Sequence, residues 1–173
     1  MRVQPGHLRW PLVVFFLFPV LQAQTPEARI DHVTVTERGV FEFKDLKDIP
    51  NEHSASRMGH LAANFILVED TPTIPAKLGI HFGFRFLVVG QPAGAIVPLK
   101  IIRKFPEPGI TNPATGKTTH QEGHTVRMAL GTGDVTGYGF DHDFELVPGK
   151  WIWEVWSGDR KLAEQSFDVV EPK

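Results

Sequence analysis

The sequence predicts an all-β fold, a single antiparallel β-sandwich of about eight or nine short strands. Apolar and polar residues alternate along one segment after another beyond Ile30, as they do where one face of a strand is buried. Turns that bear glycine or proline separate these segments, and the chain contains 16 Gly and 14 Pro. Helical periodicity is weak, and only residues 54–63 leave a choice between one or two helical turns and a loop.

The clearest strand covers residues 78–88. Its apolar residues all fall on even positions, whereas Gly79, His81, Gly83 and Arg85 occupy odd positions. At helical period the apolar side chains would be scattered around the axis, so the alternation predicts a strand with one buried face. The predicted inward set is Leu78, Ile80, Phe82, Phe84, Phe86 and Val88.

The other strands follow from the same rule. Residues 30–43 are rich in β-forming types, with a bulge expected at Gly39, and residues 65–68 form a short apolar strand. Pro98 indicates an edge strand or a strand start. Further alternating stripes are Val97, Leu99 and Ile101; Val126, Met128 and Leu130; and Tyr138, Phe140, Phe144 and Leu146. The last two strands, residues 151–156 and 162–170, are expected to form a hairpin across Gly158.

A tight turn precedes the last pair of strands. Pro148 fixes φ and Gly149 accepts positive φ, a combination that suits such a turn. Beyond the turn, Trp151 and Trp153 fall on one face and Trp156 on the other. We expect the first two to anchor the core, since a buried aromatic side chain covers roughly 150–250 Å². The predicted structural residues are Trp151, Trp153, Pro148, Gly149, Tyr138, Phe82 and Phe84.

Residues 1–23 have the three parts of a secretory signal peptide. Arg2 and Arg9 make the start positive, residues 12–21 form an apolar run, and Ala23 is a small residue at the cleavage point. The apolar run is roughly half as long as a membrane span requires. We therefore expect a flexible mature N-terminus at residues 24–29 and one domain over residues 30–173. The expected location is periplasmic or extracellular, with no membrane span after cleavage.

The composition narrows the possible partners. The chain has no cysteine, so the domain depends on packing rather than on disulfides. Residues 1–23 contain two of the 18 basic residues and none of the 20 acidic ones, which leaves a formal charge of −4 on the remainder. No cluster of Lys or Arg occurs, so nucleic acid is not an expected partner.

Three segments together resemble the bacterial family called domain of unknown function 3859. They are residues 71–86 (TPTIPAKLGIHFGFRF), 106–116 (PEPGITNPATG) and 138–153 (YGFDHDFELVPGKWIW). The resemblance extends over about residues 30–170 and implies an exported β-sandwich domain. It supplies no catalytic residues, so none are assigned.

An acidic cluster is one candidate for a metal site. Asp141, Asp143 and Glu145 are expected on one face of a strand, with Cα atoms about 6.6 Å apart at two residues' rise. Carboxylate oxygens at that spacing could hold Ca²⁺. The same charges could equally keep a solvent-facing strand soluble.

A histidine pair is the other candidate. His120 and His124 lie in or beside an expected loop of residues 106–124. Imidazole together with carboxylate suits Zn²⁺ or Cu²⁺, provided that the loop folds around the ion. The candidate metal ligands are therefore His120, His124, Asp141 and Asp143, and no cofactor is expected.

No segment has the pattern of a catalytic motif. Residues 131–137 are glycine-rich but lack the Lys-Ser/Thr of a phosphate loop and precede a strand, so we interpret them as a turn. The chain has no Gly-x-Ser-x-Gly elbow and no Ser-x-x-Lys pattern. We expect a protein that is not an enzyme.

The favoured function is binding by an exported module, immunoglobulin-like in broad terms, whose partner is a protein or an envelope component. Loops at the ends of a rigid sandwich commonly carry recognition, and the two long ones expected here are residues 45–60 and 106–124. One alternative is a metal-binding protein that uses the loop histidines. Another is a small carbohydrate-binding or carbohydrate-active protein, in which Trp156 stacks on a sugar ring. The binding candidates are Trp156, Asn112, His120 and His124.

Overall fold

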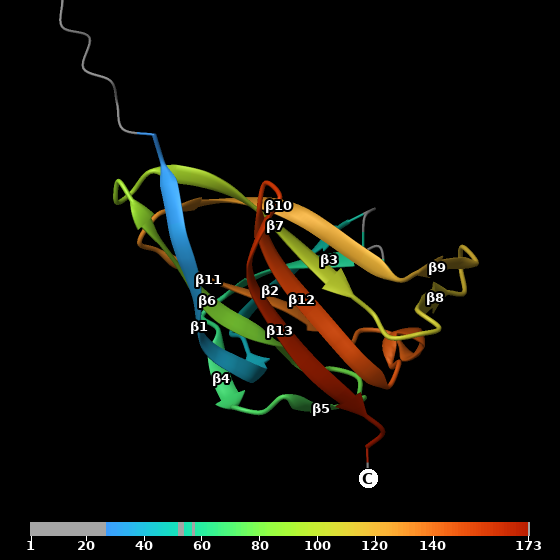
Figure 1. Ribbon diagram of the computed structural model, residues 1–173. Coiled ribbons are helices and arrows are strands. Elements are labelled where there is room, and N and C mark those ends of the chain that lie inside the picture. The colour runs from blue at the N-terminus through green and yellow to red at the C-terminus, as the bar shows by residue number, and fades with distance from the viewer. Residues whose placement is uncertain (1–26, 52–53, 57, 173) are drawn as a thin grey trace, which may run out of the picture.

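The chain folds into a β-sandwich whose two main sheets pack face to face (Figure 1). The structure is a computed structural model that describes residues 27–51, 54–56 and 58–172. The expected signal peptide and residues 24–26 of the expected flexible segment lie outside these residues. No helix in the described part of the chain is long and apolar enough to cross a membrane.

One sheet has four strands in the order β11-β6-β1-β4, and the other has five in the order β10-β7-β12-β13-β5. The first contains β1 (Arg29–Glu42), β4 (Ile66–Glu69), β6 (His81–Gln91) and β11 (Gly133–Gly139). The second contains β5 (Thr73–Pro75), β7 (Ile96–Lys104), β10 (Gln121–Ala129), β12 (Gly149–Ser157) and β13 (Arg160–Val170). Separate hairpins are β2 (Asp45–Pro50) with β3 (Met58–Ala63), and β8 (Ile110–Asn112) with β9 (Lys117–Thr119).

The all-β prediction is confirmed, but its strand count was too low. The described residues form thirteen strands, because the two segments expected as long loops each contain a hairpin. Short strands with weak alternation escape a pattern search, and β8 and β9 have only three residues each. The sandwich is also not wholly antiparallel, since β5 pairs with β13 in the parallel direction.

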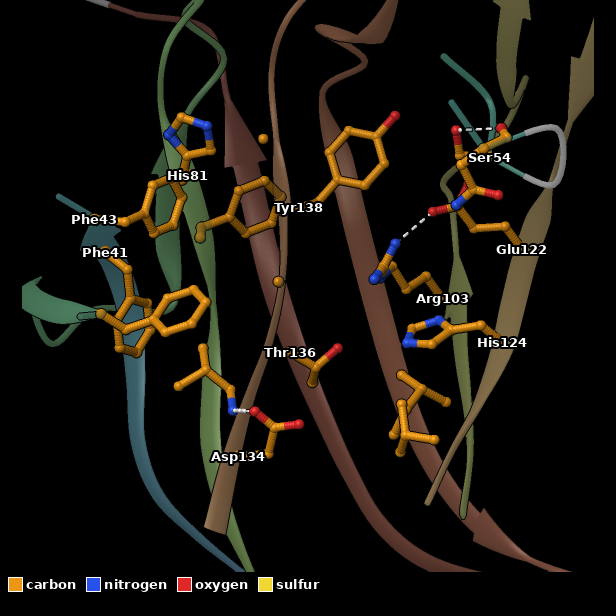
Figure 2. Close-up of a pocket in the computed structure, with 18 of the residues that line it drawn as sticks. Phe41, Phe43, Ser54, His81, Arg103, Glu122, His124, Asp134, Thr136 and Tyr138 are labelled. Atoms are coloured by element: carbon orange, nitrogen blue, oxygen red, sulfur yellow. Dashed lines mark hydrogen bonds and ion pairs between the residues drawn. The ribbon is translucent and has the colours of Figure 1, made fainter. Parts of the chain in front are cut away.

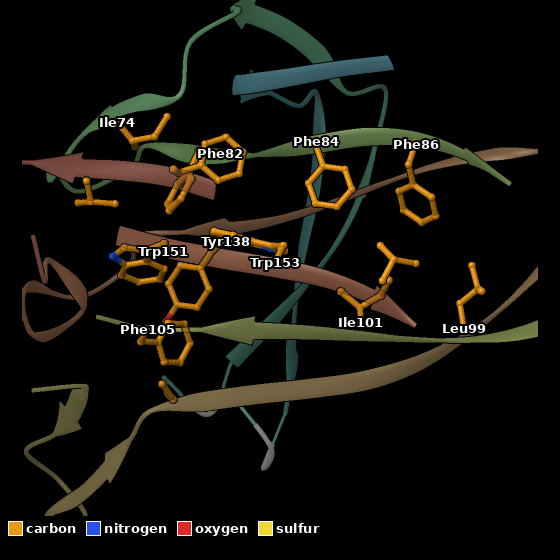
Figure 3. Packing of buried hydrophobic residues seen from close by; sticks show 14 of the residues in the cluster. Ile74, Phe82, Phe84, Phe86, Leu99, Ile101, Phe105, Tyr138, Trp151 and Trp153 are labelled. Atoms are coloured by element: carbon orange, nitrogen blue, oxygen red, sulfur yellow. The ribbon is translucent and has the colours of Figure 1, made fainter. Parts of the chain in front are cut away.

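The core lies between β6 and the pair β7 and β12 (Figure 3). Phe82 is 1% exposed, and its ring centroid lies 5.6 Å from that of Trp151 and 5.3 Å from that of Trp153, both near perpendicular. Edge-to-face contacts of this kind each contribute about 0.5–1.5 kcal/mol beyond the burial of area. The expected core roles of Trp151, Trp153, Phe82 and Phe84 are thereby confirmed, and each of the four is at most 1% exposed.

The strand expected from residue 78 begins only at His81. Gly79 adopts a φ of 79° and donates its N–H to the Phe140 carbonyl, which makes this segment a turn. Leu78 is consequently 46% exposed instead of buried. The even-numbered stripe is correct from Phe82 onward, where the backbone is extended.

Two backbone features differ in position from the prediction. The bulges of β1 against β6 lie between Ile30 and His32 and between Val35 and Glu37, whereas Gly39 pairs directly with Gly83. Gly39 is required for another reason, because a Cβ there would lie 1.9 Å from the Glu69 carbonyl oxygen. Pro98 is near the start of β7, which is a central strand, and lies outside the stretch that pairs with β12.

The glycine-rich segment is mostly strand. Of this segment, only Gly131 and Thr132 belong to the turn between β10 and β11, together with Leu130, and residues 133–139 pair with β6 along their whole length. The strand then ends at Gly139, so the expected continuation to Leu146 is wrong. A 3₁₀ turn, η1 (Asp143–Glu145), replaces it, and Pro148 and Gly149 lead into β12 as expected.

Candidate functional site

A cavity of about 470 Å³ follows β11, an edge strand of the four-stranded sheet. We call it the β11 cavity. Inside the sandwich it is bounded by Arg103 of β7, by Glu122 and His124 of β10, and by Thr136 and Tyr138 of β11 (Figure 2). Its volume falls in the range of about 300–1,000 Å³ that is typical of ligand pockets.

Thr136 carries a buried hydroxyl at the centre of this cavity. The residue is 6% exposed, and its Oγ1 has no hydrogen-bond partner in the described part of the chain. Figure 2 shows this hydroxyl turned toward the strands that carry Arg103 and His124. Burial of an unpaired hydroxyl costs about 1–3 kcal/mol in proteins, so the group has an unmet capacity to bind.

Arg103 and Glu122 form a buried ion pair beside the hydroxyl. The distance from Arg103 Nη1 to Glu122 Oε1 is 2.6 Å, and their side chains are 17% and 4% exposed. The guanidinium also lies 6.0 Å from the centre of the Tyr138 ring. Arg103 Nε is buried and has no partner among the described residues, so this N–H is a donor that a ligand could satisfy.

Glu122 also fixes the tip of the β2–β3 hairpin. The Ala55 N–H donates to Glu122 Oε2 at 2.9 Å, and the Ala55 carbonyl accepts from Asn112 Nδ2 at 3.2 Å. Asn112 is 7% exposed and accepts from the Ala114 N–H at 3.0 Å. The structure therefore places Asn112, a predicted binding residue, in a structural role that joins two hairpins.

His124 was expected in or beside a loop, but it lies in β10 and pairs with Ile101 of β7. Its ring lines the β11 cavity, although the residue as a whole is exposed. Partial burial of the ring and the positive charge of Arg103 lower the pKa of His124 to about 4. The imidazole is therefore neutral at pH 7.

Tyr138 is held in place by Glu145 of η1. Its hydroxyl donates to Glu145 Oε1 at 2.6 Å, and the other carboxyl oxygen accepts the N–H groups of Asp141 and His142 at 2.9 and 2.8 Å. Burial raises the pKa of the Glu145 carboxyl, and the three hydrogen bonds oppose that change. Burial also raises the pKa of Tyr138, with a further contribution from Glu145. This network ends β11 and turns Glu145 inward, away from the solvent-facing position expected for it.

The cavity continues around β11 to the outer face of the same sheet. Phe41, Phe43, Phe65 and His81 line that part. The Phe43 ring centroid lies 5.3 Å from that of Phe65 and 4.4 Å from that of His81, both in edge contacts. Gly137 and Gly139 of β11 face this aromatic group without side chains of their own.

The expected metal ligands do not form one site. In the part of the chain that the structure describes, no three His, Asp or Glu side chains gather closely enough to hold an ion. His120 is exposed outside the β11 cavity, with its Nδ1 3.5 Å from Glu107 Oε1. Asp141 and Asp143 are exposed around η1 and do not share a strand face, because the strand has already ended.

Trp156 lies on the outer face of the five-stranded sheet and is half-buried. Its Nε1 donates to Glu154 Oε2 at 3.0 Å, and Lys161 Nζ lies 6.0 Å from the ring centre. Burial disfavours the ionised form of Glu154, but hydrogen bonds from Lys104, Trp156 and Lys161 outweigh it and lower the pKa of Glu154. The indole is thus engaged with its neighbours and does not line the β11 cavity.

Sequence reasoning did not single out Thr136, Arg103 or Glu122. Arg103 continues the odd-numbered stripe of Val97, Leu99 and Ile101, and Glu122 continues the even-numbered stripe of β10. Charged residues at positions that alternation assigns to the inside are the signal that could have identified them. Thr136 lay in the glycine-rich segment that we had interpreted as a turn.

The comparisons with known proteins agree with this architecture. Residues 29–169 match the family described as Domain of unknown function (DUF3859). Among solved structures, the chain is similar to an immunoglobulin-like protein (PA1606) from Pseudomonas aeruginosa, with 32% sequence identity and a TM-score of 0.53. That similarity covers 86% of this chain and 100% of the other. No curated protein matches the chain.

Proposed function

The chain belongs to the family described as Domain of unknown function (DUF3859), and we propose that it is a binding module that takes its ligand into the β11 cavity. The module is not an enzyme and acts outside the cytoplasm, in the bacterial envelope or released from it. Export is supported by the charge and apolar pattern of residues 1–23.

The observation that carries the proposal is the buried hydroxyl of Thr136, which has no hydrogen-bond partner among the described residues. A fold selected for stability alone would place valine at this buried position, because valine has nearly the same shape and no polar atom to satisfy. A ligand with a hydrogen-bond acceptor would meet both the hydroxyl and the free Nε of Arg103. Burial of this hydroxyl lowers the stability of the fold, and binding sites commonly contain groups that lower stability but serve recognition.

Two further polar groups of the cavity support binding rather than catalysis. The Glu122 carboxyl is engaged by Arg103 and by the Ala55 N–H. The Tyr138 hydroxyl is engaged by Glu145. Groups fixed in this way shape a recognition surface, whereas general acids and bases must release and take up protons near the working pH.

A thermal-shift screen of the purified protein against peptides, saccharides and divalent metals tests the proposal. A ligand at 100 times its Kd adds about 2.7 kcal/mol of stability, which raises Tm by several degrees. We expect the rise to persist in Thr136→Ser, which keeps the hydroxyl, and to shrink in Thr136→Val. Trp156→Ala is the matched control on the other sheet and should respond as the native protein does. A rise that Trp156→Ala removes and Thr136→Val leaves intact would refute the proposed site.

A further inference from the structure

We propose, building on the binding function above, that the ligand is an extended polypeptide segment that adds as another strand to the edge of β11 that no described strand pairs with. Strand addition of this kind draws affinity from main-chain hydrogen bonds and specificity from alternating side-chain sites. The β11 cavity offers both, on the two faces of one edge strand.

The first support is the direction of the main-chain groups of β11. In the described residues β11 pairs with β6 alone. Phe140 N–H donates to Ile80 and the Thr132 carbonyl accepts from Val88, so the even-numbered residues bond toward β6. Because the pattern alternates in an antiparallel pair, the N–H and C=O groups of the odd-numbered residues point away from β6.

Among the described residues, one side chain blocks part of this edge. The N–H of Val135 donates to Asp134 Oδ1 at 2.8 Å, a bond that Figure 2 shows at one end of the strand. A side chain that caps one outward N–H is a common protection of an edge strand. Gly137 and Gly139 follow on the same edge and line the β11 cavity. Neither has a side chain of its own, although the His81 ring packs onto the outer face of Gly139.

The second support is the difference between the two faces. On the outer face, an incoming strand would set its side chains beside Gly137 and against Phe43 and Phe65. The His81 ring already covers Gly139, where a Cβ would lie 2.4 Å from His81 Cδ2. Large apolar or aromatic side chains fit beside Gly137, because they cover a glycine on a neighbouring strand. On the inner face, the neighbours are Thr136 and Arg103, which favour a side chain with a hydrogen-bond acceptor, such as an amide.

Charge favours a segment with basic ends. The cavity contains one arginine against the carboxyl groups of Glu122, Asp134 and Asp141, while His124 is neutral. Asp134 and Asp141 are exposed near the two ends of β11. The expected partner is therefore a strand in which aromatic and amide side chains alternate, flanked by Lys or Arg.

A pair of methylated peptides provides the test. The probe is a labelled peptide of sequence Lys-Phe-Asn-Phe-Asn-Phe-Lys, and its affinity for the purified protein is measured by fluorescence anisotropy. In one derivative the Phe amides are N-methylated, and in the other the Asn amides. Only one of these sets can face β11, so strand addition predicts that one derivative binds at least tenfold more weakly than the other. It also predicts that the amides of Gly137 and Gly139 exchange hydrogen at least tenfold more slowly in the complex.

A substitution in the strand gives a second readout. Val135→Pro removes an N–H that makes no bond to β6 and obstructs the edge, whereas Val135→Thr retains the N–H. We expect at least a tenfold loss of peptide affinity in the proline variant and none in the threonine variant. If the proline variant does not fold, the methylated pair still decides the question.

The outcomes separate this inference from the proposed function. One result would overturn strand addition and leave the cavity as the site. In it, both methylated peptides bind equally well, the glycine amides exchange no more slowly in the complex, and Thr136→Val still loses affinity. Absence of peptide binding, together with a saccharide or small molecule whose thermal shift depends on Thr136, would do the same. If peptide binds with the predicted asymmetry but does not depend on Thr136, the strand edge stands and the proposed role of the hydroxyl fails.

Discussion

Glu145→Ala is expected to destabilise the protein strongly, because this fully buried carboxyl accepts three hydrogen bonds. Its partners are the Tyr138 hydroxyl at 2.6 Å and the N–H groups of Asp141 and His142 at 2.9 and 2.8 Å. Alanine would leave all three donors without their acceptor. At about 1–3 kcal/mol for each of the three unsatisfied groups, the free energy of unfolding should fall by roughly 3–9 kcal/mol.

A loss of this size is a large part of the stability of a typical domain, which is about 5–15 kcal/mol. Urea unfolding followed by tryptophan fluorescence measures it, and the melting temperature should fall by about 10 °C or more. Glu145→Gln keeps one acceptor oxygen and should lose less. Asp143→Ala, on the exposed side of η1, is the matched control and should change stability by less than about 0.5 kcal/mol.

A fall of less than about 1 kcal/mol in Glu145→Ala would refute the reasoning, since the three donors would then have other partners or solvent. The result also bears on the β11 cavity. Tyr138 lines that cavity and owes its position to Glu145. A destabilised but folded variant should therefore also bind a cavity ligand more weakly.

Three further predictions concern the surroundings of the β11 cavity. Gly83→Ala should lower stability by about 2 kcal/mol or more, because the new Cβ would lie 2.1 Å from the Thr136 carbonyl oxygen; unchanged urea unfolding would contradict this. The native protein should lose stability as pH falls from 6.5 to 4, since a lowered pKa for His124 means that the unfolded chain binds the proton more readily. In His124→Gln, the free energy of unfolding should fall by about 1 kcal/mol less than in the native protein over that interval, because solvent screens the charge of an exposed residue. Parallel plots of stability against pH for the two proteins would contradict the lowered pKa of His124. Glu122→Gln should lower the free energy of unfolding by about 3 kcal/mol, because it leaves Arg103 without its ion-pair partner. It should also speed limited proteolysis within the β2–β3 hairpin, since the Ala55 N–H would lose its carboxylate acceptor. A variant as resistant to protease as the native protein would contradict that role of Glu122.

The core could be predicted from the sequence because alternation is a local property. Phe82, Phe84 and Phe86 share one face in any extended strand, and so do Trp151 and Trp153. No knowledge of the partner sheet was needed to place these side chains inside.

The site could not be predicted in the same way, because it depends on which strands become edges. Thr136 and Arg103 are 33 positions apart in sequence, and they meet only because β11 and β7 belong to sheets that face each other. The inward position of the Glu145 carboxyl could not be predicted for a related reason. Its inward position requires η1, whose bonds to Tyr138 and His142 override the alternation that assigned it to solvent.

The most direct test of the account is the free energy of unfolding of Thr136→Val in the absence of any ligand. Among the described residues the Thr136 hydroxyl is buried without a partner. We propose that it is kept for recognition. Valine removes that polar group at nearly constant volume, so the variant should be more stable than the native protein by about 1 kcal/mol. A variant that is less stable by a similar amount would show that the hydroxyl already has a partner within the fold, and would contradict the central claim.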